Sequence, residues 1–316
     1  MTTTLSDMIN EVSMNLSGYT LTQDRSTYIK SAVAATASSS ASPIVLSLGS
    51  TDNVGKGIVE IDEELFWIDT YDRVGNTATV APYGRAYLGT TLAEHAVDTK
   101  VTISPTFPKF SIKRAINDTI KGLSGILFAA DTTTITYSSA VSTYRLPTTG
   151  TSLGIRNVLS LAYESIGPSK EWIPIRSWRF DSNANNTAFD SKQTVSIYDM
   201  ITSGRTIQIV YSKDPTSFSN LATLALTNAQ VFTSITGLPD SCRDLVILGS
   251  TYRLLSNLDP ARAAMVSAQA DETDSKRPYG SSQSLTRQIY ALYTQRLAEE
   301  VKSQQSKYPI RVHYSL

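Results

Sequence analysis

Apolar residues recur at helical spacing in four stretches of the chain, and shorter apolar runs fill much of the sequence between them. In each helical stretch the apolar positions follow steps of three or four residues, which places them on one face of a helix. The weaker pattern at 23–35 predicts another helix, and the small, mostly polar residues at 36–42 indicate a linker. The four stronger helices are predicted at 5–16, 109–128, 240–257 and 284–302.

Two regions have the patterns typical of strands. Region 43–104 contains short apolar runs bounded by Gly, Asn and Asp, which predicts a small antiparallel β module. Region 131–215 is rich in Thr, Ser, Val, Ile and Tyr, which predicts a second antiparallel β domain. Gly204 lies between the last two predicted strands and suggests that they form a hairpin. The strands predicted in the second region are 134–137, 142–146, 158–163, 194–198 and 206–211.

Together these patterns predict an α+β fold, in which a helical bundle carries a small inserted β module and a second antiparallel β domain. A chain of 316 residues exceeds the size at which single cores usually stop growing, so more than one domain is expected. The predicted segments are N-terminal helices and linker (1–42), β module (43–104), central helix (105–130), β domain (131–215), C-terminal helices (216–305) and an extended tail (306–316).

The β module contains the most specific local pattern in the chain, R-x-x-x-G-T-x-x-A-x-H. Arg85 is suited to binding loop carbonyls or a carboxylate such as Glu94 or Asp98, because its guanidinium presents five donors in a rigid fork. Gly84 and Gly89 are expected to supply positive φ where the chain reverses, and Thr90 or Thr91 to bind local backbone. These residues predict a fixed structural turn. Its members are Arg85, Gly89, Thr90, Ala93 and His95.

Candidate catalytic groups are few and isolated. His95 is expected to pack or to form hydrogen bonds, because no second His, Cys or clustered carboxylate stands around it at ligand spacing. The acidic run 62–64 is interpreted as a solvated hairpin turn, and Cys242, the single cysteine, as a buried residue. Lys113 is assigned to a solvated helix face. Motifs for phosphate binding, acyl transfer or zinc proteolysis are absent, so no enzyme activity, cofactor or metal site is predicted.

Composition excludes several further classes of function. Lys plus Arg and Asp plus Glu both number 28, so no basic surplus favours free nucleic-acid binding, although a neutral chain can line a conduit for DNA. A single cysteine agrees with a reducing cytoplasm. No stretch approaches 18 apolar residues and the N-terminus lacks a secretory pattern, so neither membrane spanning nor export by that route is expected.

The pattern at 85–95, with the apolar strand 101–103 after it, resembles a small β module of virion proteins from tailed bacteriophages. The order of helix, β module, helix, β domain, helices and tail resembles the head-to-tail adaptor, or connector, proteins of these phages. This resemblance implies a homo-oligomeric ring, with a dodecamer as one candidate, that joins the portal to the tail and lets DNA pass without sequence-specific binding. It implies contacts with the portal protein and with a tail or further neck protein, in a virion assembled in the host cytoplasm.

The last residues alternate apolar and polar side chains, as in a strand without a nearby partner. Such a tail can add to another subunit's sheet, or it can fray. By resemblance, its apolar residues contact the portal. They are Tyr308, Ile310, Val312, Tyr314 and Leu316.

Two alternatives stay open. One is another tail or baseplate component, because the β-module pattern also occurs in such proteins. The other is a receptor- or glycan-binding virion protein, in which Trp172 and Trp178 beside Pro174 would supply an aromatic platform. The many predicted helices argue against this second alternative, because fibres and sugar-binding spikes are usually β throughout.

Overall fold

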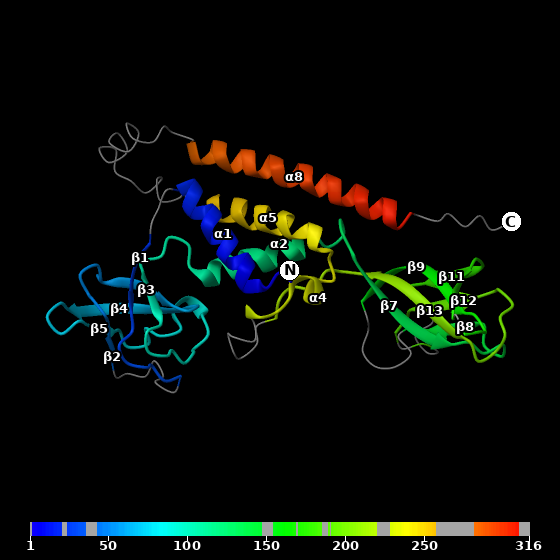
Figure 1. Ribbon diagram of the computed structural model, residues 1–316, viewed down its shortest axis with the longest axis horizontal. Coiled ribbons are helices and arrows are strands. Elements are labelled where there is room, and N and C mark those ends of the chain that lie inside the picture. The colour runs from blue at the N-terminus through cyan, green and yellow to red at the C-terminus, as the bar shows by residue number, and fades with distance from the viewer. Residues whose placement is uncertain are drawn as a thin grey trace. The chain divides into compact units, whose positions relative to one another are not determined.

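A computed structural model describes residues 2–20, 24–35, 43–146, 154–168, 170–184, 189, 191–219, 228–256 and 281–309. Within these ranges the protein is mostly β, with 13 strands in three antiparallel sheets and five α-helices (Figure 1). The predicted helical bundle with β insertions is therefore wrong. The physical reason is that the β regions enclose two apolar cores of their own and do not depend on the helices for burial.

The chain forms two compact units, each of which combines segments that are far apart in the sequence. Unit 1 contains Met1–Thr119, Phe218–Val231 and Arg243–Thr294. Unit 2 contains Ile120–Ser217, Phe232–Cys242 and Gln295–Leu316.

The helices of unit 1 are α1 (Leu5–Thr20), α5 (Arg243–Leu255), most of α2 (Lys109–Gly122) and the first half of α8 (Ser281–Lys307). The predicted N-terminal helix is confirmed, and its first turn is capped by reciprocal hydrogen bonds between Thr4 and Asp7. Gly249 in α5 allows close packing, because a Cβ there would lie 2.5 Å from the Thr119 methyl group and 3.0 Å from the Tyr293 ring.

A six-stranded antiparallel sheet forms the β part of unit 1, in the order β1-β6-β3-β4-β5-β2. The predicted helix at 23–35 is wrong, because this segment contains β1 and continues as extended chain, with bridges from Ile29 to Leu48 and from Val33 to His95. Ile29 and Val33 are spaced as on a helix, but both enter the core of the sheet. The strands are β1 (Arg25–Tyr28), β2 (Ile44–Ser47), β3 (Gly57–Ile61), β4 (Glu64–Asp72), β5 (Thr77–Val80) and β6 (Lys100–Ile103).

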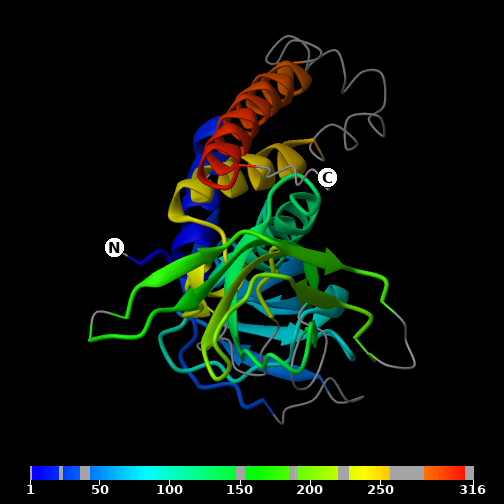
Figure 2. The ribbon, with the colours of Figure 1, turned by 90° about the vertical axis from the view of Figure 1, so that its right-hand side faces the viewer.

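Unit 2 contains two further antiparallel sheets that share one apolar core (Figure 2). Their orders are β10-β9-β13-β7 and β11-β12-β8. The predicted hairpin at Gly204 is wrong, because β12 and β13 belong to different sheets, and Gly204 instead donates its N–H to the Tyr137 carbonyl. The strands are β7 (Ala129–Thr136), β8 (Thr143–Arg145), β9 (Ile155–Glu164), β10 (Trp172–Ile175), β11 (Trp178–Asp181), β12 (Thr194–Ile197) and β13 (Thr206–Lys213).

The remaining helical parts of unit 2 are α4 (Phe232–Thr236), the 3₁₀ turn η2 (Asp240–Cys242) and the second half of α8. Gln304 of α8 binds both backbone groups of Phe128: its amide donates to the Phe128 carbonyl at 2.6 Å and its oxygen accepts from the Phe128 N–H at 3.2 Å. The end of α8 is thereby fixed to the segment that leads into β7.

Candidate functional site

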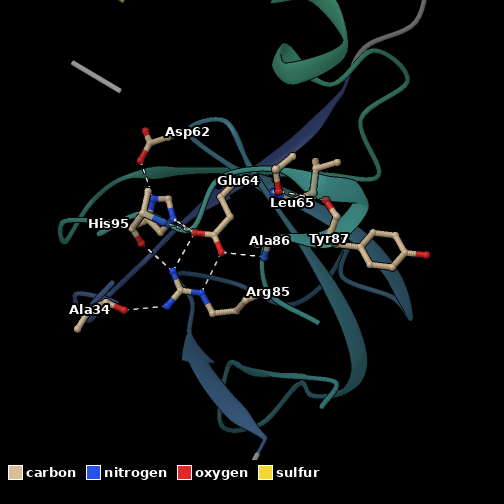
Figure 3. Close-up of polar contacts among 10 residues, drawn as sticks. Ala34, Asp62, Glu64, Leu65, Arg85, Ala86, Tyr87 and His95 are labelled. Atoms are coloured by element: carbon tan, nitrogen blue, oxygen red, sulfur yellow. Dashed lines mark hydrogen bonds and ion pairs between the residues drawn. The ribbon is translucent and has the colours of Figure 1, made fainter. Parts of the chain in front are cut away.

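Four charged side chains of the β module form one hydrogen-bonded group, called here the ionic cluster: Asp62, Glu64, Arg85 and His95 (Figure 3). Arg85 binds Glu64 in a bidentate manner, with Nε 2.9 Å from Oε1 and Nη2 2.8 Å from Oε2. His95 lies between two carboxylates: its Nε2 is 2.9 Å from Glu64 Oε2 and its Nδ1 is 2.7 Å from Asp62 Oδ2. The side chains of Arg85, Glu64 and His95 are 0% exposed, so this pairing is shielded from water.

The ionic cluster also fixes the backbone around it. Glu64 accepts the N–H groups of Ala86 and Ala93, each at 3.0 Å, in addition to its side-chain donors. Arg85 donates to the carbonyls of Ala34 and Ala93, each at 2.7 Å. A single carboxylate on β4 therefore holds both sides of the turn formed by the sequence pattern. Arg85 connects this turn to the chain that follows β1.

Thr90 connects the end of this turn to β4. Its hydroxyl donates to the Tyr87 carbonyl at 3.0 Å and accepts the Leu65 N–H at 3.1 Å, so the predicted backbone-binding role of Thr90 is confirmed. The 3₁₀ turn η1 (Tyr87–Gly89) reverses the chain with φ of 56° at Leu88 and 79° at Gly89. Positive φ at Gly89 agrees with the prediction.

Gly84 is required for a different reason than predicted. It is not among the described residues with positive φ. A Cβ at this position would lie 2.8 Å from the Ala81 carbonyl oxygen and 2.9 Å from the Trp67 carbonyl oxygen. The close approach of the Trp67 carbonyl and of the Ala81 carbonyl in the same turn, and not positive φ, excludes a side chain there.

The acidic run 62–64 was expected to be solvated, and for two of its three residues this is wrong. Glu63 is 6% exposed and Glu64 is 0% exposed, whereas the Asp62 side chain is 44% exposed. Arg85 binds loop carbonyls, as predicted, but its carboxylate partner is Glu64 and not the predicted Glu94 or Asp98. The physical reason is sheet geometry: β4 begins at Glu64 and directs this side chain inward, under a turn 21 residues further along the chain.

Two more buried carboxylates connect the sheet to the first turns of α2. Glu63 Oε2 lies 3.2 Å from Lys113 Nζ, so the solvated face predicted for Lys113 is wrong for this residue, which is 7% exposed. Glu60 Oε1 accepts the Lys109 N–H at 2.6 Å and so caps the helix. Burial raises the pKa of Glu60 to about 7.

The protonation of the ionic cluster follows from its geometry. Burial opposes charge on both central groups, but hydrogen bonds outweigh it. For Glu64, donation from His95 and Arg85 lowers the pKa to about 2. For His95, the bonds to Asp62 and Glu64 raise its pKa above the ordinary value. A protonated His95 donates from both ring nitrogens, so the cluster has no free imidazole lone pair to act as a base. Of its two carboxylates, Glu64 is inaccessible and the Asp62 side chain is 44% exposed.

Stability should therefore fall as pH rises from about 5 to about 7 and beyond. Glu60 and His95 both hold their protons more tightly in the folded state, so their stabilising contributions are complete at low pH and are lost as pH passes their folded pKa values. Thermal unfolding at constant ionic strength measures this trend. In Glu60→Gln, which can still accept the Lys109 N–H, the decline below about pH 7 should become smaller. A wild-type midpoint that rises across this range would contradict the assignment.

Other candidate groups do not join the ionic cluster. Cys242 is 2% exposed, as predicted, with its Sγ 3.6 Å from Glu300 Oε2. Trp172 is 43% exposed on edge strand β10, whereas Trp178 lies in β11 of the other sheet and packs against the shared core. They therefore do not share one strand or one sheet.

Within the described ranges, His, Cys, Asp and Glu form no group of three or more that could hold a metal ion. Asp62 and Glu64 bind opposite ring nitrogens of His95, which leaves no common coordination point. The helices that the structure describes include none long and apolar enough to cross a membrane.

Of the tail residues predicted to contact the portal, Tyr308 is described. Its ring lies 5.8 Å from the ring of Phe128, and its N–H donates to the Gln304 carbonyl. Ile310, Val312, Tyr314 and Leu316 lie outside the described residues.

No protein-family model matches the chain, and no curated protein matches it either.

Proposed function

We propose that this chain is a structural protein of a tailed-bacteriophage virion, a head-to-tail adaptor that forms a homo-oligomeric ring between the portal and the tail. The observation that carries the proposal is the convergence of Arg85, Ala93 and His95 on the buried Glu64. These residues belong to the pattern on which the resemblance to phage virion proteins rests. Their contacts support the view that the pattern encodes a three-dimensional module and is not a chance match.

The chemistry of the ionic cluster supports a mechanical role. Both oxygens of Glu64 accept more than one hydrogen bond, and both ring nitrogens of His95 are occupied. The cluster can hold a turn rigid, and its buried members Glu64, Arg85 and His95 offer no group to a substrate. A rigid β module within a chain of zero formal net charge suits a particle part past which DNA moves without sequence-specific binding.

Helix α8 supports self-association. In its unit 1 half, Ile289 and Tyr293 are buried, while Tyr290 and Leu292 are 50% and 47% exposed. Exposed aromatic and aliphatic side chains on a long helix suit contact with a neighbouring subunit. In the proposed ring this part of α8 packs on the next copy, and the chain beyond Pro309 reaches the portal protein. A tail or further neck protein binds the ring on its other side.

The mostly β fold favours a second candidate function more than the sequence did. Receptor- or glycan-binding virion proteins are usually β throughout, so the argument against them from many helices is weaker. Trp172, exposed on an edge strand, could stack on a sugar ring. Retention on immobilised glycans that is lost in Trp172→Ala would favour this candidate.

Removing residues 310–316 should abolish attachment to the portal protein of the same particle while leaving the subunit folded. The truncation retains Tyr308, because its contact with Phe128 belongs to unit 2 and its loss would disturb the fold. Co-purification with tagged portal protein measures attachment, and circular dichroism checks folding. The matched control replaces residues 310–316 with a Gly/Ser segment of equal length. Portal binding that survives both changes would contradict the proposed contact.

A further inference from the structure

Arg253, near the end of α5, is a half-buried cation without an anionic partner among the described residues. Its guanidinium lies over the Tyr252 ring, with Cζ 5.7 Å from the ring centroid. Its Nε is buried and has no hydrogen-bond partner within the described part of the chain. A buried donor left unpaired costs about 1–3 kcal/mol, so such atoms in a folded protein need an explanation.

Arg253 is also among the residues that line a cavity of about 580 Å³ within unit 1, formed by residues of α2 and of the end of α5. A second arginine, Arg114, also lines it; its side chain is 77% exposed and lies 4.0 Å from Asp118, a long contact for an ion pair. Hydroxyl groups also line the cavity. Its polar lining residues are Ser111, Arg114, Asp118, Tyr252, Arg253 and Ser256.

We propose that this cavity binds a phosphate group, held by Arg253 with support from Arg114. An arginine fork matches the oxygens of a phosphate in a bidentate manner, and partial burial strengthens the pairing. Two arginines against the one carboxylate of Asp118 leave a net positive charge in the cavity. Its volume falls within the range of roughly 300–1,000 Å³ that is usual for small-molecule sites.

The phosphate can come from a free ion or from the backbone of double-stranded DNA, and the recognising chemistry is the same. All lining residues belong to one unit of one chain, so the site does not require the proposed ring. A free subunit should already bind, and failure of the adaptor proposal would leave this inference intact.

The test measures binding of inorganic phosphate to the full-length protein by calorimetry, and binding of a labelled short DNA duplex by anisotropy, with chloride at constant ionic strength. Arg253→Ala should weaken binding of the active ligand at least about tenfold, because the bidentate contact is lost. Arg253→Lys should fall between wild type and alanine, since it keeps the charge but not the fork. Arg114→Ala should have a smaller effect.

Arg73→Ala is the matched control, because Arg73 lies 5.7 Å from the Tyr71 ring just as Arg253 lies over Tyr252, but it does not line the cavity. Saturable binding of inorganic phosphate that depends on Arg253 supports a site for the free ion. Binding of the DNA duplex but not of inorganic phosphate, again dependent on Arg253, supports a site for the phosphates of the DNA backbone. Absence of saturable binding for both ligands, or equal losses in Arg73→Ala and Arg253→Ala, overturns the inference. Thermal melts confirm that each variant is folded.

Discussion

Replacing Glu64 with alanine should destabilise the protein by about 3–5 kcal/mol, the loss typical when one partner of a buried ion pair is removed. Arg85, whose side chain is 0% exposed, would keep its charge without the carboxylate that balances it, and His95 would lose one of the two hydrogen bonds that raise its pKa. The N–H groups of Ala86 and Ala93 would also lose their acceptor. Chemical denaturation, with the free energy of unfolding extrapolated to water, measures the loss.

Glu94→Ala is the matched control for this variant. Glu94 belongs to the same turn pattern and carries the same charge, but it is exposed. Its removal should change the free energy of unfolding by no more than about 0.5 kcal/mol. Glu64→Gln separates the loss of the negative charge from the loss of the side chain, because the amide keeps an acceptor near Arg85 but cannot neutralise the charge of the guanidinium. If Glu64→Ala and Glu94→Ala had the same effect, the ionic cluster would not be the centre of the module.

Gly84→Ala should destabilise the protein by about 1–3 kcal/mol, as expected for a group forced into a filled space. Two of the three atoms that a Cβ would meet are backbone carbonyl oxygens, those of Ala81 and Trp67, at 2.8 Å and 2.9 Å. Backbone oxygens fixed in a sheet and a turn cannot move aside as the end of a flexible side chain can. Thermal and chemical unfolding measure the change.

Two glycines nearby separate the causes. Gly89 has φ of 79°, and a Cβ there would meet no atom within 4 Å, so Gly89→Ala tests backbone strain alone, at about 1 kcal/mol. Gly55 has open space and no positive φ, so Gly55→Ala should be close to neutral. The expected order of destabilisation is Gly84, Gly89, Gly55. A Gly84 variant as stable as the Gly55 variant would show that the backbone segments are not packed closely there.

Local patterns predicted most helices and strands, because their spacing is written in consecutive residues. Helix α1 buries Leu5, Met8 and Val12 as its periodicity indicated. The same rule failed in the segment after β1, where Ile29 and Val33 have helical spacing but enter a sheet core through isolated bridges. The fold class was wrong for a related reason: long amphipathic helices give a strong pattern, whereas many short strands give a weak one.

The candidate site was predicted in part. The residues of the turn were identified, but Glu64 was missed because its contact with Arg85 joins a neighbouring strand to the turn, and no local spacing reveals it. The predictions for Lys113 and Glu63 failed for the same reason. Each residue looks like a surface charge in the sequence, and only the packing of α2 on the sheet brings the two together. One clue was present in the sequence: an arginine in a turn flanked by apolar strands needs a carboxylate, and the acidic run 62–64 was a candidate within the module.

The most direct test of the adaptor proposal is the native mass of the full-length protein, alone and mixed with the portal protein of the same particle. A head-to-tail adaptor should form a complex in which a fixed whole number of copies binds each portal assembly. A protein that stays monomeric and forms no complex with the portal would contradict the adaptor proposal, and would favour another tail component or a receptor-binding protein.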